Sequence, residues 1–243
     1  MSRKSPNVEI LLEPGKAATV YKSGTIARID LEYTVGDGSW VTVSFRNCET
    51  YRWHCKYLNS YIMQMGVSVS RDGSKVFVQT WDMGILCYDS RTGERLWKTR
   101  SRRGVTTLVV NEKTLCCHRH EYSLQLIDIE TGEVLKEKRP ANSWGADILD
   151  EHHILCQVTA KRWEVIRTDD LEVVDSFAHK PLFSQIEEKL KPYTSEDDGE
   201  WCYRGTDYDG NRLLIDMFRP VQPDRMEQLS KTVVLPYTIP DEK

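Results

Sequence analysis

The sequence has no long apolar run, no cysteine framework and no strong excess of charge of one sign. Its first residues, MSRKSPNVEILLEPG, contain no apolar stretch of signal-peptide length, and nothing later approaches a membrane-spanning helix. The formal net charge of -4 gives no general attraction to nucleic acid or to an anionic membrane, because phosphate binding needs clustered Lys and Arg. We therefore expect a soluble, cytoplasmic protein with neither nucleic acid nor membrane among its partners.

The seven cysteines form an odd set at irregular spacing. Most of them stand in apolar, strand-like runs, where cysteine packs as a small hydrophobic residue. Together with the missing secretory signal, this pattern indicates free thiols in a reducing compartment. The sequence also lacks a serine nucleophile elbow, a phosphate-binding glycine loop and a kinase motif, so we expect no cofactor.

What the sequence does contain is an internal repeat with a period of 39 residues. The segment YDSRTGERLWK, beginning at Tyr88, aligns without a gap on IDIETGEVLKE, beginning at Ile127. A third copy, IRTDDLEVVDS, begins 39 residues further on, at Ile166. The upstream runs KVFVQT, TLCCHR and HILCQV keep the same offset. Because two separate segments keep one period over three copies, the chain is predicted to have a repeat architecture.

Each repeat has the pattern of short strands joined by tight turns. A side-chain oxygen of Asp89 or Asp128 can accept backbone N–H bonds at the start of the turn, and Gly93 or Gly132 can adopt a positive φ. Leu171 replaces this glycine in the third copy, so we expect a different turn there.

The repeat resembles that of the pyrroloquinoline-quinone-type β-propellers. Their pattern of a strand followed by G-x-L-x-x-D-x-x-T-G-E-x-x-W is matched by MGILCYDSRTGERLW at residues 83–97 and, without the tryptophan, by SLQLIDIETGEVLK at 123–136. In that family the tryptophan docks between neighbouring blades, so the resemblance implies a structural role for Trp97. Because Lys136 and Asp175 occupy the equivalent positions, the resemblance favours non-enzymatic relatives over the cofactor-binding dehydrogenases.

We predict one all-β domain over residues 1–243, a β-propeller of about five blades made of roughly 39-residue, four-stranded repeats. The clear repeats cover residues 61–180, and degenerate blades cover 22–60 and 198–240. A short helical insertion is predicted at 181–193, where apolar residues have helical spacing.

Two further expectations concern the ends of the repeat array. A hairpin around Gly36-Asp37-Gly38 is expected to turn alternate apolar residues toward the core, namely Ile29, Leu31, Tyr33, Val41, Val43 and Phe45. The early strand VEILLEP is expected to pair with TVVLPYTI near the C-terminus, because closing the ring removes exposed edge strands.

Four residues are the candidates for partner binding. Arg100, Arg102 and Arg103 belong to a basic run that joins two blades, and arginine suits bidentate contacts with carboxylate or phosphate. The alternative interpretation of this run is a solvated linker. Trp144 stands in the loop-like segment ANSWGAD, where it is either an interface anchor or an inter-blade packing residue.

The sequence offers two metal-like patterns, and we assign a metal to neither. Cys116, His118 and His120 alternate along a strand and would face one side, as zinc ligands or as a buried thiol beside polar edge histidines. Residues 207–211 resemble the first half of a calcium loop, but Phe218 stands where the bidentate Glu is needed, so a hairpin turn is expected.

Two hypotheses for the function follow. The leading one is a non-enzymatic, protein-binding propeller that serves as a scaffold, an inhibitor or an antitoxin-like partner. The alternative is a small-molecule enzyme, with or without a metal, whose site at the propeller channel gathers carboxylates such as Asp82, Glu121 and Asp147.

Overall fold

In the computed structural model the chain divides into two compact units, Met1–Gly145 and Ala146–Lys243. The structure describes residues 4–5, 8–13, 16–34, 37–56, 67–80, 84–99, 106–109, 111–119, 123–138, 146–159, 161–194, 200–220 and 228–240. No helix within these residues is long and apolar enough to cross a membrane.

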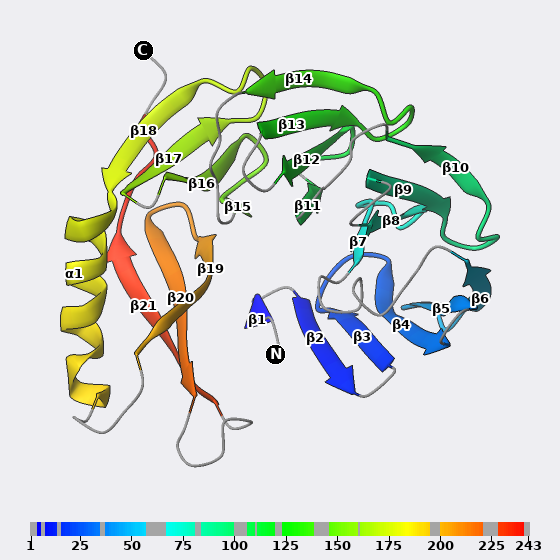
Figure 1. Ribbon diagram of the computed structural model, residues 1–243, viewed down its shortest axis with the longest axis horizontal. Coiled ribbons are helices and arrows are strands. Elements are labelled where there is room, and N and C mark those ends of the chain that lie inside the picture. The colour runs from blue at the N-terminus through cyan, green and yellow to red at the C-terminus, as the bar shows by residue number, and fades with distance from the viewer. Residues whose placement is uncertain are drawn as a thin grey trace. The chain divides into compact units, whose positions relative to one another are not determined.

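The first unit is built from three antiparallel sheets, which follow one another along the chain (Figure 1). The first sheet has six strands: β1 Lys4–Ser5, β2 Val8–Glu13, β3 Lys16–Tyr21, β4 Ile26–Thr34, β5 Gly38–Phe45 and β6 Thr50–Cys55. The second has four: β7 Val67–Val69, β8 Lys75–Thr80, β9 Gly84–Asp89 and β10 Arg95–Lys98. The third also has four: β11 Thr106–Val109, β12 Thr114–Arg119, β13 Ser123–Asp128 and β14 Val134–Lys138.

The second unit contains two more sheets and the helix. Its four-stranded sheet consists of β15 Ala146–Ile148, β16 His153–Thr159, β17 Arg162–Arg167 and β18 Val173–Ala178. Its three-stranded sheet consists of β19 Cys202–Tyr208, β20 Arg212–Pro220 and β21 Gln228–Pro236. Between them lie α1 His179–Leu190 and the short 3-10 helix η2 Lys191–Tyr193, which confirm the predicted helical insertion.

In all five sheets, strands adjacent in sequence are hydrogen-bonded neighbours, so each sheet is an antiparallel meander. This is the blade pattern that the repeat predicts, and the fold class is an all-β propeller type with one short helix. The 39-residue repeat appears in the register as well. Lys75 pairs with Asp89 in the second sheet, and Thr114 pairs with Asp128 in the third.

Apolar side chains fill the space between successive sheets of the first unit. One cluster joins residues of β4, β5 and β6, such as Val41 and Trp53, to residues of β8 and β9, such as Val78. A second cluster joins Phe77 of the second sheet to Leu115 of the third. The predicted hairpin is confirmed, since its alternate apolar residues are buried or packed against the first cluster: Ile29, Leu31, Tyr33, Val41, Val43 and Phe45.

The second unit has its own apolar core. Leu182, Ile186 and Leu190 place one face of α1 in a cluster with residues of β17, β20 and β21, including Trp163 and Ile215. The helix also contacts β18 and β21. The helical spacing of the three apolar residues is therefore explained by burial against the sheets.

The expected pairing of the early strand with the late strand would join the two units and stays a prediction, and the pairings described for these strands lie within each unit. β2 pairs with β3 over all six of its residues, and its first two residues also pair with β1. β21 pairs with β20 over all nine of its residues. In both units the strand pairs with its neighbour in sequence, because closing a short connection costs little conformational entropy.

Candidate functional site

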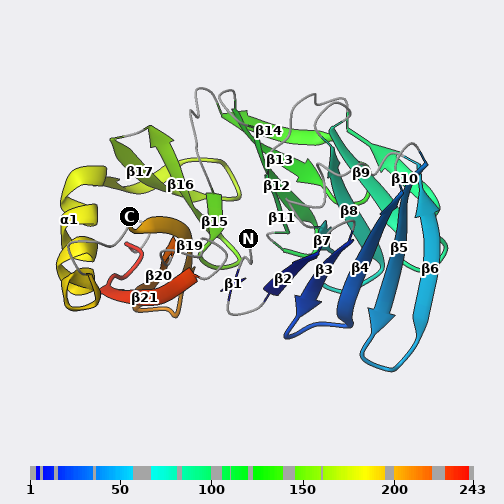
Figure 2. The ribbon, with the colours of Figure 1, turned by 60° about the horizontal axis from the view of Figure 1, so that its bottom comes forward.

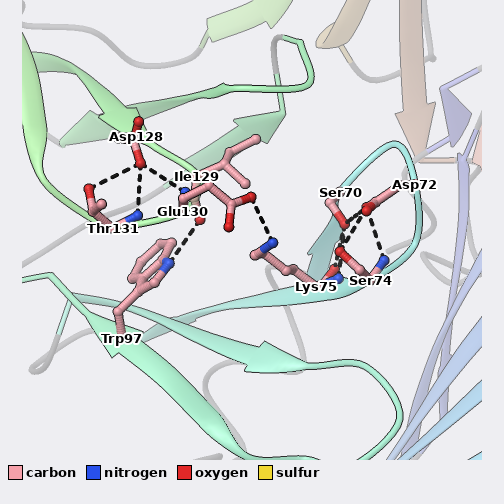
Figure 3. A network of polar contacts seen from close by, with 9 residues as sticks. All are labelled: Ser70, Asp72, Ser74, Lys75, Trp97, Asp128, Ile129, Glu130 and Thr131. Atoms are coloured by element: carbon pink, nitrogen blue, oxygen red, sulfur yellow. Dashed lines mark hydrogen bonds and ion pairs between the residues drawn. The ribbon is translucent and has the colours of Figure 1, made fainter.

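The turn that defines the repeat is held by one carboxylate (Figure 3). Asp128 Oδ1 accepts hydrogen bonds from the backbone N–H of Glu130 at 2.9 Å and of Thr131 at 2.7 Å, and from the Thr131 hydroxyl at 3.0 Å. Asp89 accepts the equivalent three bonds in the second sheet, at 3.0, 2.8 and 3.0 Å. The mechanism predicted for this turn is therefore confirmed.

A tryptophan of the preceding sheet docks on each of these two turns. In Figure 3, the Trp97 indole N–H donates to the backbone oxygen of Ile129, at 2.8 Å. Gly132 has a φ of +73°, and a Cβ atom there would lie 2.6 Å from Cε3 of the Trp97 ring. Two separate reasons therefore require glycine at this position: the positive φ of the backbone and the Trp97 ring packed against it. The inter-blade role that the resemblance implied for Trp97 is confirmed.

Trp53 does the same on the other turn, which sequence reasoning missed. Its indole N–H donates to the backbone oxygen of Ser90 at 3.2 Å, and a Cβ on Gly93 would lie 2.4 Å from its Cγ. Its ring also stacks on Tyr88, with centroids 5.1 Å apart. Trp53 lies 44 residues before Trp97 (97 − 53), so the 39-residue period does not find it.

A polar network completes the contact between the second and third sheets (Figure 3). Lys75 Nζ lies 2.8 Å from Glu130 Oε1, and the lysine side chain is only 13% exposed. Burial by itself would lower the pKa of Lys75, but the hydrogen bond and charge of Glu130 and the charge of Asp72 raise it above its usual value. Asp72 is oriented by Ser70 and Ser74, whose hydroxyls donate to its Oδ1 at 2.6 and 2.9 Å. The network fixes β8 against the turn before β14.

The turn of the third copy has the same backbone as the first two, so the expectation of a different turn is wrong. Leu171 has a φ of +62°, close to the +70° of Gly93. Its N–H donates to the Arg167 oxygen at 2.9 Å, as that of Gly93 does to the Asp89 oxygen at 3.0 Å. Arg167 stands at the position of Asp89, and Asp170 stands at the position of Thr92. Asp170 pairs with Arg167 and accepts from the Glu172 N–H at 2.9 Å, as the Thr92 hydroxyl accepts from the Glu94 N–H at 3.2 Å. This support offsets a left-handed conformation that costs a leucine about 1–2 kcal/mol.

A second surface of interest is the open face of the first sheet, whose strands lie side by side in Figure 2. Side chains alternate along a strand, so the buried set that includes Val41 and Trp53 leaves its neighbours on the opposite face. Trp40 stands there and is 39% exposed. It pairs in register with Glu32 of β4 and with His54 of β6.

The exposed indole of Trp40 is held by charged and aromatic neighbours. The Arg52 guanidinium lies 4.7 Å from the ring centroid, within cation–π range, and the His54 ring stands edge-on at 5.1 Å. Glu32 accepts from Arg52 at 3.0 Å and lies 3.4 Å from Lys16 Nζ. We call Trp40, Arg52, His54 and Glu32 the Trp40 face. Sequence reasoning overlooked it, although alternation with Val41 already places Trp40 outward.

The four predicted partner-binding residues are not described by the structure. Arg100, Arg102, Arg103 and Trp144 all lie outside the described residues, so their role stays a prediction.

The metal-like patterns are resolved in part. Cys116 is fully buried in β12, whereas the His118 side chain and His120 lie outside the described part of the chain. Within that described part, no group of three or more His, Cys, Asp or Glu side chains is arranged to hold a metal. Asp209 forms a hairpin turn as expected, with its carboxylate accepting from the Arg212 guanidinium at 2.8 Å and the Asn211 N–H at 3.1 Å.

Of the three carboxylates considered for an enzyme site, Asp82 and Glu121 lie outside the described residues. Asp147 accepts a hydrogen bond from the hydroxyl of Tyr203, which also lies 2.8 Å from the Thr206 hydroxyl. This bond joins β15 to β19, so Asp147 connects the two sheets of the second unit.

Comparison with known proteins gives a family and a fold. The family model described as outer membrane protein assembly factor BamB matches residues 24–170, more than half of the chain. No curated protein matches. The crystal structure of BamB from Moraxella catarrhalis superposes with a TM-score of 0.54 at 10% identity, covering 94% of this chain and 75% of the other.

The WD40 domain of Pan2 from Neurospora crassa superposes with a TM-score of 0.53 at 10% identity, covering 96% of this chain and 79% of the other. At such low identity these likenesses establish the fold alone. The family match includes the first two copies of the Asp-x-x-Thr-Gly-Glu turn and both docked tryptophans. The chain therefore belongs to the propeller-repeat family described as outer membrane protein assembly factor BamB.

Proposed function

We propose that this protein is a non-enzymatic, protein-binding propeller and that the Trp40 face is a contact surface for its partner. Membership of a family described as an assembly factor supports a role in binding other proteins. Scaffold, inhibitor and antitoxin-like partner are all versions of this function. The free state of all seven cysteines supports the cytoplasmic location that we also propose.

The observation that carries the proposal is the exposed and pre-oriented indole of Trp40. Tryptophan and arginine dominate the residues that contribute most to protein interfaces. Trp40 is held by Arg52 on its ring face and by His54 at its edge, so little side-chain freedom is lost on binding. The ion pair of Arg52 with Glu32 provides a polar border around this aromatic anchor.

The basic run of Arg100, Arg102 and Arg103, together with Trp144, is proposed as a further contact to the same kind of partner. Its test is independent of the Trp40 face. Replacing Arg102 and Arg103 together by Glu is expected to weaken capture of an acidic partner at least tenfold, because both charges reverse. Unchanged capture of every partner would remove this basic run from the function.

The test of the function is a tagged capture from the native host, quantified by mass spectrometry. The wild-type chain is expected to recover a partner near one-to-one, and Trp40→Ala to recover at least tenfold less, as expected for an interface anchor. Tyr193→Ala is the matched control, because Tyr193 is also an exposed aromatic residue with a cation, Lys231, 4.1 Å from its ring centroid.

Three outcomes would contradict the proposal. Capture that stays empty even after crosslinking would remove the protein-binding function. Equal recovery by wild type and Trp40→Ala would remove the Trp40 face from it. Equal losses in Trp40→Ala and Tyr193→Ala would show that exposed aromatic area, rather than this face, determines capture.

A further inference from the structure

The outermost strands of the three repeats share one irregularity. Each carries a β-bulge, which inserts an extra residue between two regular pairs. The extra residues are Leu96 in β10, Leu135 in β14 and Val174 in β18, 39 residues apart. The same apolar position can therefore be compared in three places.

In β18 this position is covered by the protein itself. Val174 packs against the core cluster of the second unit. Beyond it, the Tyr237 ring stands edge-on to Phe177 with centroids 5.1 Å apart, and the Tyr237 hydroxyl donates to Asp175 at 3.1 Å. Burial and the neighbouring Asp175 carboxylate raise the pKa of Tyr237, so its hydroxyl keeps the donated proton. A following segment thus covers an outer strand by one apolar contact and one polar contact.

In β14 the residues equivalent to Val174 and Asp175 are uncovered. Leu135 is 55% exposed and its neighbour Val134 is 45% exposed. Lys136, at the position of Asp175, is exposed as well. Four consecutive exposed residues in a five-residue strand make β14 the most open of the three outer strands. We call Leu135 and Lys136 the β14 surface.

The charge at this surface is opposite to that of β18. Lys136 replaces Asp175 and Lys138 replaces Phe177. The register pairs Lys136 with Leu126 and Lys138 with Leu124, so both lysines share one face of the sheet and Glu137 lies on the other. A segment that covers β14 as Tyr237 covers β18 must offer an acceptor where Tyr237 offers a donor.

We propose that the β14 surface binds an extended segment of a partner protein, which places a carboxylate against Lys136 and an apolar side chain on Leu135. The proposal rests on the protein-binding function proposed above and adds a second surface with a defined chemistry. The contact is made by side chains rather than by strand addition, because a bulge and a lysine both disfavour pairing at an edge.

The test uses two synthetic peptides, Ser-Glu-Leu-Glu-Leu-Glu-Ser and the same peptide with Lys for each Glu, measured by fluorescence anisotropy. The full chain is expected to bind the acidic peptide at least tenfold more tightly than the basic one. Lys136→Glu should reverse this order, and Leu135→Ser should weaken binding of the acidic peptide about fivefold through lost apolar contact. Both side chains are exposed, so thermal unfolding should remain that of wild type.

Leu96→Ser is the matched control, because Leu96 is the exposed bulge residue of the neighbouring repeat. It is expected to leave the affinity unchanged. Equal affinity of the wild type for both peptides, an unchanged order in Lys136→Glu, or an equal loss in Leu96→Ser would each overturn the proposal. If the peptide test fails while capture still depends on Trp40, only the β14 surface is overturned. If no partner is captured at all, the proposed protein-binding function is overturned as well.

Discussion

The second, third and fourth sheets each contain a turn with the same backbone conformation. The residues that form this turn differ between the first two sheets and the last. Gly93 and Gly132 stand at the left-handed position in the first two turns, and Leu171 stands there in the last. The first two each receive a tryptophan ring, from Trp53 and Trp97. In β14, the outermost strand of the third sheet, Lys136 stands at the position that tryptophan holds in β10. Glycine and docked tryptophan therefore occur together, and the two replacements occur together.

This comparison separates two reasons for glycine in the repeat: the positive φ of the turn and the space that the tryptophan ring needs. A positive φ alone is tolerated by leucine when other bonds hold the turn, here those of Asp170 with Arg167 and Glu172. A ring packed within 3 Å of the missing Cβ leaves room for no side chain. Hydrogen bonds therefore keep the same turn backbone in all three sheets. Glycine is needed only where the tryptophan of the neighbouring sheet packs against the turn.

The largest expected effect comes from removing a docked ring. Trp53→Ala is expected to lower the free energy of unfolding by about 4 kcal/mol, since it opens a cavity and leaves the Ser90 oxygen without its donor. Urea unfolding measures this change. Trp40→Ala, which removes an exposed ring from the same sheet, is the control and should cost less than about 1 kcal/mol. Similar losses for both would contradict the stabilising role assigned to the docked ring.

Next in size is the substitution that distinguishes ring contact from backbone strain. Gly132→Ala is expected to cost about 3 kcal/mol in unfolding free energy, because the left-handed backbone and the overlap with Trp97 both oppose the methyl group. Gly210→Ala has a positive φ of +96° but no atom within 4 Å of the new Cβ, so about 1 kcal/mol is expected. Equal costs at the two sites would contradict the role assigned to the tryptophan.

The smallest expected effect is the change in the stability of the Asp89 turn at acidic pH. Burial alone would raise the pKa of Asp89, but hydrogen bonds from the backbone of Thr92 and Arg91 and from the Thr92 hydroxyl lower it below its usual value. A carboxylate with a lowered folded-state pKa contributes stability above its unfolded pKa and loses it as the pH falls through the folded value.

Asp89→Asn should therefore be less stable than wild type at pH 7, and the difference should narrow as the pH falls below about 4. Urea unfolding at pH 7, 4 and 3 measures this difference. A difference that stays constant over this range would show that the charge of Asp89 is not what holds the turn.

Much of the fold could be predicted from local residue patterns, because the patterns themselves are local. The alternation around Val41 and Val43, the helical spacing of Leu182 and Ile186, and the Asp128 turn each depend on neighbours within a few residues. Contacts between distant segments could not be predicted in this way. Trp53 lies out of phase with the repeat, so its docking on Gly93 became visible only in the structure.

The candidate sites show the same division. Arg100, Arg102, Arg103 and Trp144 were predicted from residue type alone and lie outside the described residues, so the structure adds nothing to them. The Trp40 face was accessible in principle through alternation. Its pre-orientation depends on Arg52, which reaches it from the neighbouring strand through the pairing register.

The sequence by itself determined the repeat, its turns, the helix and the all-β propeller class, because periodic apolar residues and turn-forming side chains act over short distances. Tertiary structure alone decided which residues are held against one another between sheets. It placed Tyr237 over β18 and left Leu135 of β14 exposed, although both strands follow the same repeat. The physical reason is that burial of a side chain depends on what approaches it in space, and a period of 39 residues carries no record of that approach.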